Sequence, residues 1–300
     1  MRNQKGSYKK NFVIVVSILI LMLVGLLFFF VAVLNIKSGE FSSKNSTKCE
    51  NKAKEYFMKG YYDLAEDEIK KCLDNKPDDK DLILILASIY DKQEKYDRSI
   101  QQYERYLELD PDDIPVLITL SALYDDQKQY KKGIALLEKA VKHAPKNYTA
   151  HNNLCWLLAQ DKQYKKALPH CQTAIEIKPG ETYIMDSMGY TLVGLGQYEE
   201  GIKFYKDAIS IDPVVPDYYK HLGDAYRSYG KNEIALDNYV TALELFYERN
   251  KNKFARDKED KKLLEELKTA ITDLDPENRR LEEMKEKIQK EKEKKISDKD

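Results

Sequence analysis

Five prolines recur at a constant interval of 34 residues, and this period constrains the fold of the chain more than any other feature. The prolines are Pro77, Pro111, Pro145, Pro179 and Pro213. A tyrosine column keeps the same interval, at Tyr62, Tyr96, Tyr130, Tyr164 and Tyr198. Two columns of small residues do so as well, at Ala53, Ala87, Ser121, Cys155, Gly189 and Gly223 and at Ala65, Ser99, Gly133, Ala167, Gly201 and Ala235. Several columns with one period indicate a stack of similar units.

Within each unit the apolar spacing is helical on both sides of a polar turn. In the second unit the turn covers 91–95, and the stripes beside it are Leu82, Leu86, Ile89 and Tyr90, then Ile100, Tyr103, Leu107 and Leu109. This pattern predicts a pair of helices in each unit. Small residues suit the point where the two helices cross, because they let the backbones approach closely. The proline closes the unit, since it cannot continue a helix.

These columns resemble the tetratricopeptide repeat (TPR), over six units at 46–79, 80–113, 114–147, 148–181, 182–215 and 216–249. The resemblance implies an all-α fold, a TPR α-solenoid in which helical hairpins form a right-handed superhelix. The sixth unit departs from the pattern, because Asn232 replaces the tyrosine and no proline closes it. Terminal units of repeat arrays are expected to be atypical.

The segment from Phe12 to Leu34 carries no charge. As a helix it would span roughly 35 Å, enough to cross a membrane core of about 30 Å. A cleaved signal peptide is the alternative, but the run is longer than its usual apolar region and no small-x-small site follows. We therefore predict a transmembrane signal anchor at 12–34, between a tail at 1–11 and a linker at 35–45. Lys9 and Lys10 favour a cytoplasmic N-terminus, which makes this a single-pass protein with an extracytoplasmic repeat domain.

The C-terminal region divides at Pro276. An apolar stripe with charged residues opposite predicts a capping helix within 250–276, over the last open face of the solenoid. Residues 277–300 are mostly Glu and Lys, with Leu281, Met284 and Ile288 at helical spacing. They form either an exposed helix or a frayed, solvated tail, and the short apolar seam favours the tail.

No catalytic motif stands in the sequence, and the repeats and the anchor account for its ordered part, so we expect no enzyme activity and no cofactor. Charged residues make up 34% of the chain, but the formal net charge is only -1. This balance argues against nucleic-acid binding.

The four cysteines form two candidate pairs, Cys49 with Cys72 and Cys155 with Cys171, each on the two helices of one hairpin. In an oxidising compartment each pair could form a disulfide, and buried free thiols are the default alternative. His151 and His170 stand near the second pair, but a complete set of four metal ligands is not evident. Ordinary packing explains these residues, so no metal site is predicted.

In proteins similar to this one, the first helix of each unit lines a concave face that binds partners. The corresponding candidates here are Leu84, Ser88, Ile118, Ala122, Asn152, Asn153, Trp156, Tyr183, Asp186, Tyr190, Lys220, Asp224 and Arg227. Trp156 either anchors a ligand in this groove or packs between units as core. We expect a scaffold or adaptor that binds a protein or peptide of unknown identity. The alternative is a structural, self-assembling homo-oligomer, which incomplete capping at Asn232 and the charged tail would serve.

Overall fold

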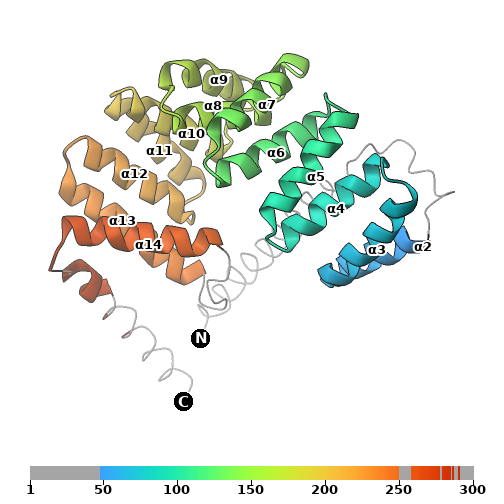
Figure 1. Cartoon of the computed structure of the whole chain (residues 1–300). Helices are drawn as coiled ribbons and strands as arrows, with labels where there is room; N and C mark the ends of the chain where they lie inside the picture. The colour runs from blue at the N-terminus through green and yellow to red at the C-terminus, as the bar shows by residue number, and fades with distance from the viewer. Residues whose placement is uncertain (1–47, 250–257, 278, 285, 287–289, 291–300) are drawn as a thin grey trace, which may run out of the picture. The chain divides into compact units, whose positions relative to one another are not determined.

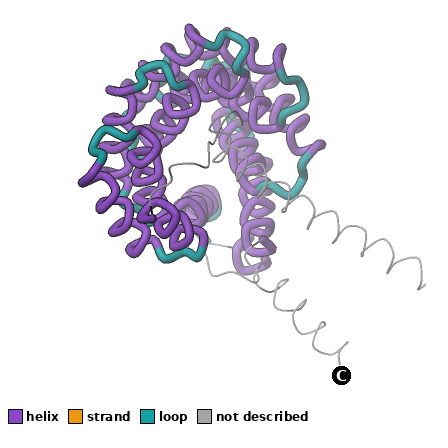
Figure 2. The backbone as a smooth tube through the Cα atoms, turned by 90° about the vertical axis from the view of Figure 1, so that its right-hand side faces the viewer, coloured by secondary structure: helices purple, strands orange, loops and turns teal. Residues whose placement is uncertain are grey.

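The computed structural model describes residues 48–249, 258–277, 279–284, 286 and 290, and the regular elements in these ranges are all α-helices (Figures 1 and 2). The chain divides into two compact units, one ending at Asn75 and the other beginning at Lys76. Each unit is described by itself below.

The first unit contains one helical hairpin, α2 (Lys48–Met58) and α3 (Tyr62–Asn75). Ala53 on α2 and Ala65 on α3 are both fully buried, as expected where two helices cross closely. The structure joins Cys49 to Cys72 in a disulfide, with 5.9 Å between their Cα atoms. Lys52 crosses the same hairpin and pairs with Glu68 at 2.9 Å.

The second unit continues the pattern with five more hairpins and a final helix (Figure 1). Its helices are α4 (Lys80–Lys92), α5 (Tyr96–Leu109), α6 (Ile114–Asp126), α7 (Tyr130–His143), α8 (Tyr148–Gln160), α9 (Tyr164–Ile177), α10 (Thr182–Gly194), α11 (Tyr198–Ile211), α12 (Pro216–Ser228), α13 (Asn232–Arg249) and α14 (Lys258–Leu274). Each of the five column tyrosines is the first residue of a second helix, and Asn232 has this place in α13. The predicted solenoid of helical hairpins is therefore confirmed.

Short polar residues begin several of the first helices. Asp79, Asp113 and Asn147 stand 34 residues apart, and each side chain accepts a hydrogen bond from a backbone N–H in the first turn of α4, α6 or α8. Such caps satisfy donors that the helix itself leaves unpaired. The following hairpins, at α10 and α12, begin without a side-chain cap.

A second set of equivalent residues lies just after the end of each first helix. Gly60, Glu94, Lys128, Lys162, Gly196 and Gly230 all have positive φ and stand 34 residues apart. One residue later, the backbone N–H of Lys95 donates to the Tyr90 carbonyl, and that of Gln129 donates to the Tyr124 carbonyl. This is the left-handed C-terminal motif that closes a helix and reverses the chain.

The small columns bring paired helices into close contact. On α10, a Cβ atom at Gly189 would stand 3.1 Å from the carbonyl oxygen of Gly201 on α11 and 2.9 Å from the Tyr205 ring. A Cβ atom at Gly201 would stand 2.9 Å from the Gly189 oxygen. Ordinary side chains do not fit at these distances, so the glycines set the separation of the two helices.

The C-terminal helix covers the last hairpin, as the sequence predicts. Leu267 and Ile271 of α14 are fully buried in a cluster with Leu243 and Phe246 of α13. The sequence favours a solvated tail for 277–300, and this prediction is wrong for the beginning of that segment. Residues 279–284 are helical, and Met284 is buried in the same cluster. The apolar seam is short, but the exposed side of α13 and α14 gives it a surface to cover.

In the part of the chain that the structure describes, no helix is long and apolar enough to cross a membrane. The predicted anchor at 12–34, the tail at 1–11 and the linker at 35–45 lie outside the described residues.

Candidate functional site

The first helices of the second unit form one continuous row. Along the stack α6 packs on α8, α8 on α10, and α10 on α12. In a curved stack of hairpins, helices that meet in this way line the concave side. We call the row of α6, α8, α10 and α12 the inner row. It brings together candidate residues that stand 34 residues apart in the sequence.

An aromatic cluster lies at the centre of the inner row. The Trp156 ring on α8 has its centroid 5.2 Å from that of Tyr190 on α10 and 6.1 Å from that of His221 on α12. The indole N–H of Trp156 donates to the Asp125 carboxylate on α6 at 2.9 Å. Trp156 and Tyr190 are only partly buried. Trp156 therefore packs between units and still presents part of its ring, which combines the two alternatives drawn from the sequence.

The Asp186–His221 pair packs against this cluster. The Nδ1 atom of His221 lies 2.8 Å from the Oδ1 atom of Asp186. Burial acts to lower the pKa of His221, but the Asp186 charge and hydrogen bond outweigh it and raise the pKa above its usual value. Asp186 is only 9% exposed, so this candidate is not on the open surface as expected. Its role in the structure is to hold the His221 ring against Trp156 and Tyr190.

Asn152 also differs from the expectation of an open position. It stands one helical turn before Trp156, is 6% exposed, and its Oδ1 atom has no hydrogen-bond partner in the described residues. An unpaired buried amide oxygen costs about 1–3 kcal/mol. Its neighbour Asn153 is partly exposed.

The acidic side chains of the inner row are electrostatically strained. Burial raises the pKa of Asp125, and the nearby Asp126 adds to this effect although Trp156 opposes it. Burial likewise raises the pKa of Asp91 at the end of α4, again with a contribution from Asp126. In both cases burial is the main cause, because the charged form of a carboxyl group is less stable away from water.

The basic candidates of the sixth unit are already paired with acids. The Lys220 ammonium lies 3.1 Å from Asp224 and 3.1 Å from Glu266 of α14. Arg227 pairs with Asp273 of α14 at 3.2 Å. Lys220 and Arg227 are predicted as candidates for partner binding, and in the structure acids of α12 and α14 neutralise their charges.

The remaining candidates lie outside the cluster, on α4 and on helices of the inner row. Leu84 and Ser88 are partly buried on α4, and the Ser88 hydroxyl donates to the Leu84 carbonyl. Ile118 on α6 packs against the core, while Ala122 on the same helix is exposed. Tyr183 on α10 is 38% exposed. The ring contacts and side-chain hydrogen bonds of the inner row therefore gather around Trp156. Ala122 and Tyr183 are the exposed candidates.

Sequence reasoning missed Asp125 and His221. Asp125 follows Ala122 by three residues, so helical spacing alone places both on one face of α6. His221 stands one residue beyond Lys220, which puts it slightly off the predicted stripe. The acids of α14 could not be found in this way, because no repeat spacing relates α14 to α12.

The second cysteine pair lies in the core of the α8–α9 hairpin. The structure joins Cys155 to Cys171 in a disulfide, with 5.3 Å between the Cα atoms. Beside it, the Nδ1 atoms of His151 and His170 are 3.1 Å apart. In the described residues no three His, Cys, Asp or Glu side chains converge as metal ligands would.

Comparisons with known proteins agree with this architecture. Tetratricopeptide repeat models match residues 126–185, and residues 81–113 and 184–214. No curated protein sequence matches the chain. A crystal structure of a tetratricopeptide repeat protein from Parabacteroides merdae ATCC 43184 is 18% identical, with a TM-score of 0.59 over 73% of this chain and 97% of that one.

Two further solved structures overlap over a shorter part of the chain. MamA from Desulfovibrio magneticus RS-1 is 21% identical over 58% of this chain and 98% of that one, with a TM-score of 0.49. YrrB, described as a TPR protein with an unusual peptide-binding site, is 22% identical over 59% of this chain and 91% of that one, with a TM-score of 0.46. The repeat models and the stack of helical hairpins together show that this chain carries tetratricopeptide repeats, folded as an all-helical TPR solenoid.

Proposed function

We propose that this protein is a membrane-tethered scaffold that binds a segment of a partner protein along the inner row. The observation that carries the proposal is the partly exposed Trp156–Tyr190 pair, one helical turn from Asn152, whose Oδ1 atom has no hydrogen-bond partner in the described residues. Tryptophan and tyrosine are the residues that most often dominate binding energy in interfaces. The partly exposed amide of the neighbouring Asn153 supplies what an extended peptide backbone needs, a donor and an acceptor.

The tether is the charge-free segment 12–34, which as a helix is long enough to cross a bilayer. Lys9 and Lys10 place the N-terminus in the cytoplasm under the positive-inside rule. The repeats would then lie outside the cytoplasm. Both cysteine pairs have the spacing of a disulfide in the structure, which suits an oxidising compartment.

Site-specific photo-crosslinking in cells tests the partner site. The photo-reactive residue p-benzoylphenylalanine replaces Tyr183, which is an exposed aromatic on α10, and in a matched control it replaces Lys203, which is exposed on α11. We expect a discrete crosslinked protein from position 183 and not from 203, and we expect Trp156→Ala to abolish it. Equal crosslinking from both positions, or a crosslink that Trp156→Ala leaves unchanged, would contradict the proposal.

A further inference from the structure

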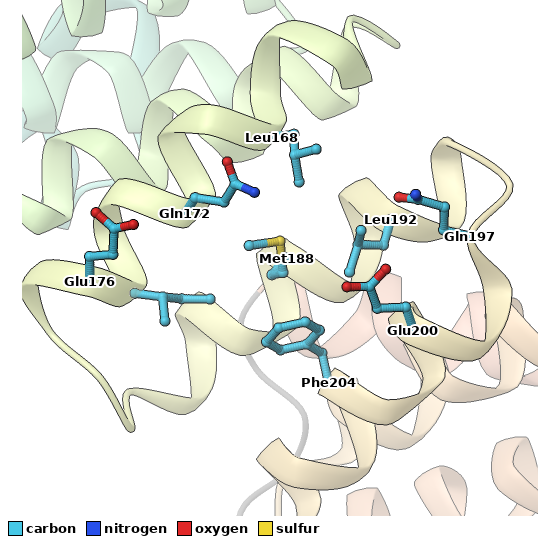
Figure 3. Close-up of a pocket in the computed structure, with 9 residues that line it drawn as sticks. Leu168, Gln172, Glu176, Met188, Leu192, Gln197, Glu200 and Phe204 are labelled. Carbon is cyan, nitrogen blue, oxygen red and sulfur yellow. The ribbon is translucent and has the colours of Figure 1, made fainter.

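A second surface is a groove of about 380 Å³ between α9 and α11 with α10 as its floor (Figure 3). Leu168, Met188, Leu192 and Phe204 supply its apolar lining. Figure 3 shows Met188 and Phe204 facing each other at the centre, with Glu176 and Glu200 on opposite sides of them. The groove is thus apolar in the middle and acidic at both ends.

The repeat itself explains why the groove is open at this point. In the α4–α5 hairpin the Arg98 guanidinium lies 5.8 Å from the centre of the Tyr90 ring. In the α6–α7 hairpin the Lys132 ammonium lies 5.0 Å from the centre of the Tyr124 ring. These cations cover the outer side of a first-helix tyrosine, through contact of the charge with the ring face.

The α10–α11 hairpin lacks both members of this pair. At the same repeat positions it has Leu192 in place of the tyrosine and Glu200 in place of the cation. The change reverses the charge and removes an aromatic ring. At another repeat position α11 has Phe204 where α5 has Gln102, which adds apolar surface to the groove. The array therefore departs from its own pattern in the direction of an acidic, apolar docking surface.

Neither Glu176 nor Glu200 has an ion-pair partner among the described residues, and both are exposed. In the neighbouring hairpin the equivalent of Glu200 is Lys166, so a basic residue is the ordinary choice at this position. A groove with unpaired acids around an apolar centre is complementary to a cationic, amphipathic ligand.

We propose that this groove docks a basic amphipathic helix of a partner protein. One bulky aliphatic side chain of the helix enters between Met188 and Phe204. Lysine or arginine residues on either side of it pair with Glu176 and Glu200, and so supply the cation that Arg98 and Lys132 supply within their own hairpins. The helices α9 and α11 are both second helices, run in the same direction and flank the groove. A partner helix laid between them would follow the helix-in-groove mode of recognition.

The test uses two synthetic helical peptides with identical leucine positions, one carrying lysine and the other glutamate at all remaining positions. Their affinity for the full chain is measured by fluorescence anisotropy. We expect the Leu/Lys peptide to bind at least about tenfold more tightly than the Leu/Glu peptide, because like charges facing each other across an interface cost several kcal/mol. Absence of binding by the Leu/Lys peptide, or equal binding of both peptides, overturns the proposal.

Variants locate the binding. Glu176→Lys combined with Glu200→Lys should weaken the Leu/Lys peptide about tenfold or more, whereas the matched pair Glu108→Lys and Glu138→Lys, exposed on α5 and α7, should not. Phe204→Gln tests the apolar centre without changing charge, since α5 carries Gln102 at this position and folds with it. Trp156→Ala should leave the affinity unchanged, which separates this groove from the inner row. An equal loss in the control pair would show that net charge alone drives binding, and would refute a site at α9–α11.

Discussion

At the scale of single residues, the array depends on a few backbone positions that the repeat reproduces. The left-handed turn residue is glycine in three of the six hairpins described, and it is Glu94, Lys128 or Lys162 in the others. A left-handed conformation costs a residue with a Cβ atom about 1–2 kcal/mol, a cost that glycine does not have. The three charged residues therefore lower the stability of their own turns.

Lys128→Gly is predicted to stabilise the protein by about 0.5–1 kcal/mol, because relief of the strained φ exceeds the extra entropy that glycine gives the unfolded chain. The matched control is Lys203→Gly in the middle of α11, where the same chemical change should destabilise by about 1 kcal/mol. Chemical denaturation of the full chain measures both. A loss of stability for Lys128→Gly would mean that the lysine side chain makes a compensating contact.

At the scale of helices, the inner row is held by contacts between hairpins as well as within them. Asp125 on α6 accepts from Trp156 on α8, and Asp186 on α10 binds His221 on α12. Each bond joins first helices of adjacent units. The inner row is thus a property of consecutive hairpins, and a change in one hairpin affects the next.

Stability attributable to the Asp186–His221 pair is predicted to fall as the pH rises. The pKa of His221 is raised in the folded protein, so the pair contributes fully below the unfolded value of about 6.5 and is lost as the pH rises through the folded pKa. Thermal unfolding at a series of pH values checks this, with Asp186→Asn as the variant that should lack the decline.

The quantity to compare in this titration is the difference in stability between the wild-type protein and the Asp186→Asn variant. The comparison is needed because the titration of His170 changes stability with pH in the opposite direction. Burial and the neighbouring His151 lower the pKa of His170, so its contribution is lost as the pH falls below about 6.5. This contribution is present in both proteins and cancels. Parallel pH profiles for the two proteins would contradict the assigned role of Asp186.

At the scale of the whole molecule, the repeats and the charge-free segment 12–34 differ in composition. The described residues form hairpins whose apolar sides are covered by neighbouring hairpins and, at the end, by α14. Such an array has no need of a membrane to complete its core. The segment 12–34, by contrast, has a length and composition suited to lipid.

Deletion of residues 12–34 is therefore predicted to move the protein from the membrane fraction to the soluble fraction without unfolding the repeats. Cell fractionation detects the first effect, and circular dichroism of the purified variant should retain a helical spectrum. A control deletion from the C-terminus, 287–300, keeps the buried Met284 in place and should leave the protein in the membrane fraction. A wild-type chain found in the soluble fraction with the segment intact would contradict the anchor.

The sequence by itself determined the period, the helical hairpins and the row of first helices, because each of these follows from local spacing that recurs every 34 residues. It also located Trp156, Tyr190 and Asn152 on one face. These placements follow from helix periodicity alone, and they do not depend on tertiary contacts.

Only the tertiary structure decided which of those residues stay open to a partner. Asp186 became buried because His221 of the next hairpin packs over it, and Lys220 was neutralised by Glu266, which belongs to a helix outside the repeat. The groove between α9 and α11 was also visible only in the tertiary structure, in a hairpin without the cation–tyrosine pair of α4–α5 and α6–α7. Charge pairing and burial depend on distances between residues far apart in the sequence, and a repeat period does not fix those distances.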